Sequence, residues 1–222
     1  VIKALLSRMG PSPRDFLLYF NVRRQRDLFA GLRYRFNRND DIIGLLYVLS
    51  RVIRKYGSLE SAFKRHYRKS DSSVEAGLAG VVDILLAVDT SVVYGDDMKR
   101  DGLLQFFPSP SRGSACKRMN IFLRWMIRDR DIDFGIWKGI PKNKLVIPLD
   151  VHIARISRCL GFTMRSAQDW KMAVEITESL KTFDPEDPLK YDFALCHQGI
   201  AGVCSSLRCD ECALFGKVET AT

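Results

Sequence analysis

Apolar residues recur along most of this chain with the three-to-four-residue spacing of helices, and strand-like alternation is scarce. In the segment from Asp41 to Tyr56 the apolar positions share one helix face, and Gly57 follows the last turn. The segment from Ser72 to Leu86 starts with serine caps and is apolar enough to be core material. The pattern predicts an all-α protein.

Cap and turn residues set the bounds of the other expected elements. Ser12 and Pro13 occupy the preferred cap and first-turn positions of a helix that runs to Phe20, and Ser58 opens another helix. Two prolines and a glycine mark residues 106–114 as a turn. The remaining expected elements are a helix over 115–128, a loop over 129–149, and helices over 150–161, 166–181 and 187 to about 199.

The length of 222 residues suits one domain or two small lobes that share an interface. The chain opens at Val1 without a methionine, which indicates that a leading segment was removed or never included. Its longest apolar runs fall short of the roughly 20 residues that cross a bilayer, and no charged-then-apolar leader is visible. We therefore expect a cytoplasmic protein without a membrane partner.

The net charge of +9 and the pI near 9.4 favour a polyanionic partner such as nucleic acid. Arginines concentrate in residues 21–38 and 117–130, whereas residues 184–187 are acidic. Two basic zones suit the two flanks of a nucleic-acid groove. The alternative is that these arginines only solvate exposed helix faces.

The run IPLDVHIARISRCLGF, residues 147–162, places Asp150 at the start of a helix that carries two arginines and ends at a glycine. A carboxylate there caps backbone N–H groups that lack partners inside the helix. The part L-D-V-H-I-A-R resembles the V-D-T-H-V-x-R run of the helix–hairpin–helix DNA glycosylase superfamily, in which the aspartate is essential. Asp150, His152 and Arg155 match, and a valine replaces the threonine.

The wider stretch, residues 106–214, resembles a DUF2400-like branch of that superfamily found in bacteria and archaea. The resemblance implies one helix–hairpin–helix glycosylase-like bundle over residues 1–222, with further helix before Val1. It also implies two lobes around a cleft, residues 1–40 with 165–222 and residues 41–164.

Lys117 falls in the first turn of the helix after the 106–114 turn. The partial positive charge of a helix N-terminus, with Arg112 and Arg118 nearby, disfavours an ammonium and favours a neutral, nucleophilic amine. Such an amine can attack the anomeric carbon of a deoxynucleotide, displace a damaged base and leave a Schiff base that permits strand cleavage. The alternative is a solvated charge on a polar face shared with Asn120, Arg124 and Arg128.

Lyase-competent members of the superfamily place this lysine in L-P-G-V-G-x-K, whereas here Gly113 precedes Lys117 by four residues instead of two. The long gap to Asp150 is similar to that of archaeal 8-oxoguanine glycosylases, which implies an oxidised purine as substrate. Asp150 would stabilise positive charge on the sugar and manage the proton of the attacking group. A pure cap is the alternative for Asp150, and His152 is expected to be structural.

The mouth of the Lys117 helix is also the expected DNA contact, because free N–H groups there point at a phosphate. The residues expected to bind DNA are Ser111, Arg112, Gly113, Ser114 and Arg118. A flipped base also needs an aromatic slot. The aromatic residues available for it, each of which could equally be core, are Phe106, Phe107, Trp125, Trp137, Trp170 and Phe193.

Four cysteines cluster near the C-terminal end in a C-x7-C-x4-C-x2-C run that suggests metal ligation: Cys196, Cys204, Cys209 and Cys212. Superfamily members such as endonuclease III bind a [4Fe-4S] cluster there through C-x6-C-x2-C-x5-C, so the position agrees and the spacing differs. An iron–sulfur cluster, zinc and free thiols all stay open. Cys116 and Cys159 are expected to be small buried residues.

The leading hypothesis is therefore a monomeric, nucleoid-associated DNA repair glycosylase with AP-lyase activity, in which Lys117 and Asp150 are catalytic. If Asp150 works with water instead, the base leaves without strand cleavage. The alternatives are a noncatalytic helix–hairpin–helix module that binds nucleic acid, and a metal-dependent structural or redox protein.

Overall fold

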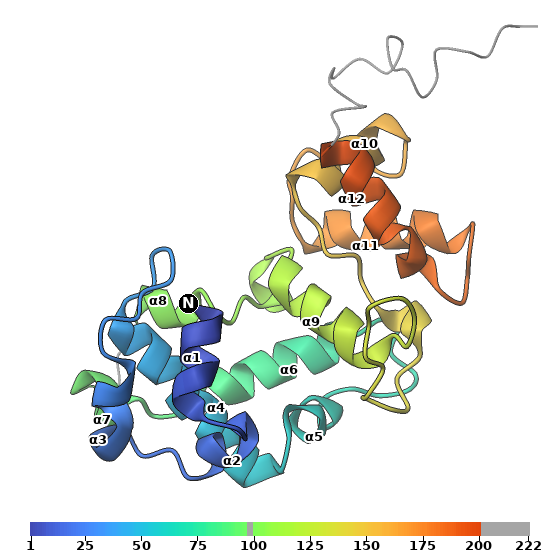
Figure 1. The fold of residues 1–222 in the computed structure, drawn as a ribbon. Helices are drawn as coiled ribbons and strands as arrows, with labels where there is room; N and C mark the ends of the chain where they lie inside the picture. Colours follow the sequence, from blue (N-terminus) through green and yellow to red (C-terminus); the bar gives the residue numbers. More distant parts are fainter. Residues whose placement is uncertain (97–99, 201–222) are drawn as a thin grey trace, which may run out of the picture. The chain divides into compact units, whose positions relative to one another are not determined.

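A computed structural model describes residues 1–96 and 100–200, and the chain divides into two units (Figure 1). The first comprises Val1–Arg68 and Glu75–Pro108, and the second comprises Lys69–Val74 and the described part of Ser109–Thr222. The prediction of an all-α protein is confirmed, since the described residues form helices and only isolated bridges of the β type.

This division differs from the expected lobes, residues 1–40 with 165–222 and residues 41–164. Helix α4 (Asn39–Tyr56) packs against α2 (Pro13–Leu18) and α6 (Glu75–Leu86), so the N-terminal segment belongs with the middle of the chain. No helix in the described ranges has the length and apolarity needed to span a bilayer.

The core of the first unit gathers around the start of α4. Buried Ile42, Ile43 and Leu46 pack with the aromatic residues of the N-terminal segment, where the Phe16 and Phe29 ring centroids lie 5.7 Å apart. The shorter helices of this unit are α1 (Ile2–Met9), α3 (Val22–Gln25), η1 (Arg26–Phe29), α5 (Leu59–Lys64), α7 (Ser91–Tyr94) and α8 (Asp101–Leu104).

The predicted caps are confirmed at several helix starts. The Ser12 hydroxyl accepts the backbone N–H of Asp15 at 3.3 Å, and the Ser58 hydroxyl accepts that of Ser61 at 3.0 Å. Helix α6, however, begins at Glu75 rather than at the serines expected from residue 72 onward.

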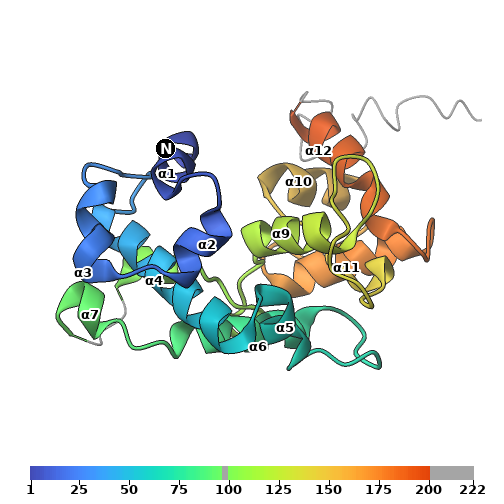
Figure 2. The same cartoon turned by 60° about the horizontal axis from the view of Figure 1, so that its bottom comes forward.

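The second unit contains η2 (Pro110–Arg112), α9 (Lys117–Ile127), η3 (Lys142–Lys144), α10 (Val151–Cys159), α11 (Trp170–Lys181), η4 (Pro188–Tyr191) and α12 (Asp192–Ile200). Helices α10 and α12 pack side by side, as Figures 1 and 2 both show. The fully buried Ile153, Ile156, Met172 and Ile176 come from α10 and α11. This packing holds the start of α10 in place.

Candidate functional site

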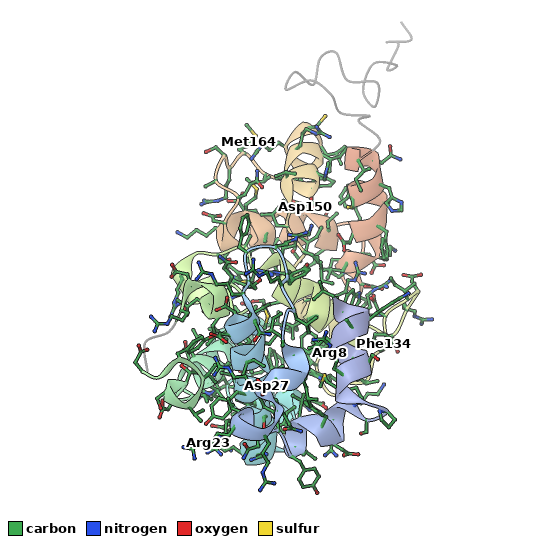
Figure 3. All side chains as sticks on the ribbon, turned by 60° about the vertical axis from the view of Figure 1, so that its left-hand side comes forward. Arg8, Arg23, Asp27, Phe134, Asp150 and Met164 are labelled. Carbon is green, nitrogen blue, oxygen red and sulfur yellow. The ribbon has the colours of Figure 1, made fainter. Side chains whose placement is uncertain are left out.

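Lys117 and Asp150 come together in the second unit, although 33 residues separate them in the chain. Lys117 is the first residue of α9, and Asp150 is the N-cap of α10 (Figure 3). The ammonium nitrogen Nζ donates to the carboxylate oxygen Oδ2 at 2.8 Å. The structure therefore brings the two expected catalytic residues into direct contact.

The two oxygens of Asp150 make different contacts. Oδ1 accepts the backbone N–H groups of His152 and Ile153, each at 2.9 Å, and so caps α10, while Oδ2 binds Lys117. The cap and the ion pair therefore coexist in one side chain. The Asp150 side chain is 14% exposed and that of Lys117 is 46% exposed, so the pair is open to solvent on the lysine side.

The charge state of Asp150 follows from competing effects. Burial alone would raise the pKa of this carboxyl group, but the hydrogen bonds from Lys117 and from the amides of Ile153 and His152 outweigh it. The pKa of Asp150 therefore lies below its ordinary value. The carboxylate is ionised at neutral pH and can stabilise a positive charge.

The turn before α9 orients Lys117. Gly113 has φ 75°, in the left-handed region that favours glycine, and its N–H donates to the carbonyl of Pro110 at 2.8 Å. The Gly113 carbonyl accepts the N–H of Trp170 at 3.2 Å, which ties the turn to the start of α11. Cys116 is also left-handed, and its N–H donates to the Ser114 hydroxyl at 3.2 Å.

The residues expected to bind DNA lie on this turn and the first turn of α9. Ser111, Arg112, Gly113 and Arg118 are exposed, and Ser114 is half-buried. The side chain of the N-cap residue Cys116 makes no cap hydrogen bond to the first turn of α9. The residues expected to bind DNA are therefore accessible to solvent beside Lys117.

Lys117 stays exposed, but the rest of the polar face that it shares is buried, which corrects that part of the alternative interpretation. Asn120, Arg124 and Arg128 are 1%, 4% and 3% exposed. The basic zone of residues 117–130 thus contributes two fewer cations to the surface than its sequence indicates. The physical reason is a set of aspartates far along the chain that pair with both arginines inside the unit.

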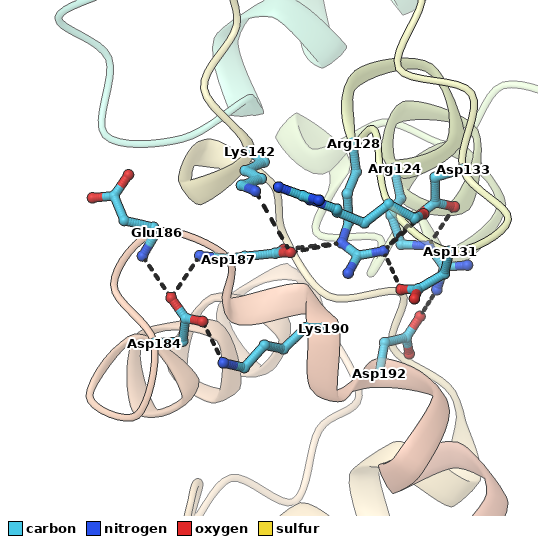
Figure 4. A network of polar contacts seen from close by, with 11 residues as sticks. Arg124, Arg128, Asp131, Asp133, Lys142, Asp184, Glu186, Asp187, Lys190 and Asp192 are labelled. Atoms are coloured by element: carbon cyan, nitrogen blue, oxygen red, sulfur yellow. Dashed lines mark hydrogen bonds and ion pairs between the residues drawn. The ribbon is translucent and has the colours of Figure 1, made fainter.

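Figure 4 shows this buried ionic network. Arg124 binds Asp133, with Nε 3.2 Å from Oδ1, and also binds Asp192 of α12. Its guanidinium lies over the Phe193 ring, 4.6 Å from the centroid. Arg124 thereby connects α9 to the loop that follows it and to the start of α12.

Arg128 is held by the same loop and by the segment before η4. Its Nε donates to both oxygens of Asp187 at 2.9 and 3.0 Å, and its Nη1 donates to Asp131 at 2.7 Å and to Asp133 at 3.0 Å. Burial disfavours the charged guanidinium, but these hydrogen bonds outweigh that effect and raise the pKa of Arg128. Since α12 packs against α10, the network fixes α9 relative to the helix that Asp150 caps.

The negative charge of Asp150 also raises the pKa of two other groups in this unit. Burial raises the pKa of Asp192, and Asp150 and Asp133 raise it further against the opposing effect of Arg124. Burial likewise raises the pKa of the Cys196 thiol, with Asp150 and Asp192 adding to the effect. Asp192 was missed from the sequence because an aspartate at a helix start usually indicates only a favourable helix-dipole contact.

Three of the six cysteines lie in the part of the chain that the structure describes. Cys116 and Cys159 are buried, as expected, Cys196 is half-buried on α12, and none of the three forms a disulfide there. Cys204, Cys209 and Cys212 lie outside the described residues. Among residues 1–96 and 100–200, no group of three or more His, Cys, Asp or Glu side chains could hold a metal ion.

The aromatic candidates for a base-stacking slot differ in how much of each side chain is exposed. Phe107, Trp137 and Trp170 are buried core residues, 5%, 7% and 4% exposed. Trp125 and Phe193, at 38% and 39%, keep accessible ring surface in the second unit.

These observations define an all-α protein with an amine–carboxylate pair at two helix starts. The chain belongs to the family described as "Protein of unknown function (DUF2400)", whose model matches residues 1–201. Neither a curated protein nor a solved structure matches the chain.

Proposed function

We propose that this protein is a DNA glycosylase with AP-lyase activity, in which Lys117 is the nucleophile and Asp150 its charged partner. The observation that carries the proposal is the 2.8 Å contact between Lys117 Nζ and Asp150 Oδ2. A nucleophile and the group that manages its proton must lie within hydrogen-bond distance of each other. The resemblance of the L-D-V-H-I-A-R run to helix–hairpin–helix glycosylases supports the same assignment.

The chemistry follows from these two groups. The resting ammonium must lose its proton before it can attack, and Asp150 Oδ2 is placed to pass that proton on to solvent, which leaves the carboxylate charged again. The amine then forms a bond to C1′ as the C1′–N bond breaks, and the base leaves with the electron pair and takes up a proton. Loss of a second amine proton and opening of the sugar ring give the Schiff base, from which β-elimination cleaves the strand.

The ionised state of Asp150 suits the moment at which the glycosidic bond breaks. Positive charge develops on the sugar ring in that transition state, and a nearby carboxylate stabilises it. The lowered pKa of Asp150 keeps the carboxylate charged for this purpose.

We infer that the exposed turn beside Lys117 holds the DNA backbone, through Arg112, Arg118 and the amides near Gly113. Trp125 and Phe193, both partly exposed, offer ring surface to a flipped base in this unit. The resemblance to archaeal 8-oxoguanine glycosylases points to an oxidised purine as the substrate.

A panel of duplexes, each with one damaged base, tests the proposal. The wild-type protein is expected to release at least one base and to nick that strand. Lys117→Ala should abolish nicking, Asp150→Asn should slow base release by about a hundredfold or more, and Lys171→Ala, which removes an exposed lysine from α11, should leave both unchanged. Binding without base release from any duplex would reject the enzyme.

A noncatalytic nucleic-acid-binding module is the second candidate, and the geometry of the same ion pair favours it in one respect. The pair joins the starts of α9 and α10, which is also what a structural tether does. Under this hypothesis, Lys117→Ala and Asp150→Asn lower the free energy of unfolding, and salt-sensitive DNA binding stays unchanged.

The metal proposal rests on sequence position alone. Cys196, Cys204, Cys209 and Cys212 are proposed to bind a [4Fe-4S] cluster, with zinc as the alternative. The iron, sulfide and zinc content of the purified protein decides between them, and the absence of all three would reject the site.

A further inference from the structure

The first unit contains a concave surface that the chemistry of Lys117 and Asp150 does not use. Two neighbouring hollows of about 410 and 300 Å³ share Tyr47 and Arg51 of α4 in their linings and are together called the α4 groove. The larger volume falls within the roughly 300–1,000 Å³ of small-molecule sites.

Cations dominate the lining of the α4 groove. Arg51 and Lys55 line the larger hollow, Arg23, labelled in Figure 3, lines the smaller one, and Asp89 is the one acidic residue of either lining. Both Asp89 oxygens are already engaged, since Oδ1 accepts the N–H of Ser91 at 2.8 Å and Oδ2 accepts its hydroxyl at 3.1 Å.

Three of the groove cations form no salt bridge with the part of the chain that the structure describes. Among the described residues, no carboxylate forms a salt bridge with Arg23, Arg51 or Lys55, all of which are exposed. Arg54 differs, because its guanidinium donates to the carbonyls of Leu18 and Phe20 and so has a structural role. Arg23, Arg51 and Lys55 give the groove a positive field that attracts an anion.

Aromatic and apolar surfaces lie between these cations. Tyr47 faces both hollows, and Tyr56 in the larger one has Lys55 over its ring, 5.3 Å from the centroid. Ile84 adds apolar surface from α6. A phosphate-only site needs no such surface, whereas a nucleotide presents a flat base for stacking next to its phosphate.

We propose that the α4 groove binds a nucleotide, with the phosphate on Arg51 and Lys55 and the base against Tyr47. The nucleotide can be free or part of a single DNA strand, since both present the same phosphate and base. The site lies in the first unit, so it goes beyond the proposed glycosylase and does not depend on Lys117 or Asp150.

The test uses the full chain and a variant matched in charge. Arg51→Gln with Lys55→Gln removes two groove cations, while Lys3→Gln with Arg24→Gln removes two exposed cations that line neither hollow. Fluorescence anisotropy measures the binding of a labelled single-stranded 12-mer at several salt concentrations. Thermal unfolding checks that both variants fold.

The groove variant is expected to lose about tenfold or more in affinity for the 12-mer. The slope of its log–log salt dependence should fall by about 1.4, because each phosphate contact on a single strand contributes about 0.7. The control variant should keep the wild-type slope. Equal losses in the two variants would overturn the proposal, because the effect would then reflect net charge alone.

Competition separates the two sources of the nucleotide. If dAMP displaces the 12-mer from the wild-type protein, and its own binding is lost in the groove variant, the ligand is a free nucleotide. If dAMP fails to compete while the groove variant still loses affinity, the ligand is a nucleotide within a strand. Displacement by inorganic phosphate at the same concentrations as dAMP would overturn the base contact. An undamaged 12-mer gives no base release in this assay, so failure of the groove proposal and failure of the glycosylase proposal stay distinguishable.

Discussion

At the scale of single residues, Asp150 both caps a helix and forms an ion pair, two roles that are usually treated as alternatives. One oxygen caps α10 and the other binds Lys117, so the geometry that satisfies the helix start also fixes the direction of the second oxygen. A side chain held at both oxygens has little freedom to rotate. This rigidity is what a charged group needs to stabilise a transition state without reorganising.

The lowered pKa of Asp150 predicts how stability changes with pH. A carboxyl group whose pKa falls on folding stabilises the protein above its unfolded pKa of about 3.9, and this contribution disappears as the pH falls through the folded value. The difference in free energy of unfolding between the wild type and Asp150→Asn should therefore be constant from pH 7 to about pH 5 and shrink below about pH 4. Urea denaturation at stepped pH measures it. A difference that grows on acidification would contradict the assigned shift.

Residues that lie at element ends could be predicted from the sequence. Asp150, Ser58 and Gly113 stand next to helices, where local backbone needs dictate residue type. The predicted caps at Asp150 and Ser58 and the predicted turn at Gly113 are confirmed. Arg124 could not be assigned, because its spacing indicates only a polar helix face. Whether that face is solvated depends on Asp192, 68 residues further on.

At the scale of elements, the starts of α9 and α10 form the candidate site. Two substitutions of Asp150 separate its effect on helix capping from its effect on base release. Asparagine caps a helix about as well as aspartate, whereas alanine does not. Asp150→Ala should lower the free energy of unfolding by about 0.5–2 kcal/mol relative to Asp150→Asn, while both variants lose base release. Chemical denaturation and the duplex assay measure the two effects. Equal stability of the two variants would reject the capping role.

The buried ionic network leads to a second prediction at this scale, for the free energy of unfolding. Arg124→Met leaves Asp133 and Asp192 inside the second unit without this cation, which should cost about 3–5 kcal/mol of unfolding free energy. Lys171→Met, at an exposed position, should change it by less than about 0.5 kcal/mol. Adding Asp192→Asn to Arg124→Met should recover part of the loss, and additive effects would show that the two side chains are not coupled.

At the scale of the whole molecule, charge is the property that the sequence describes least completely. The net charge of +9 predicts a polyanionic partner, and this count already includes both Arg124 and Arg128 and the aspartates that they neutralise inside the second unit. The buried network therefore changes where the surface cations lie and not the net charge. Arg51 and Lys55, which form no salt bridge with the described residues, lie outside both arginine-rich zones of the sequence. Periodicity predicted the helices well, whereas long-range ion pairing and the grouping of helices into units depend on contacts that no local pattern contains.

The most direct test of the central claim is to trap the protein on lesion-containing DNA with borohydride and to map the modified residue by mass spectrometry. If the Lys117 amine attacks the sugar, reduction of the Schiff base leaves a stable adduct on the peptide that contains Lys117, and Lys117→Ala forms none. An adduct on another lysine, or base release without any adduct, would contradict the account.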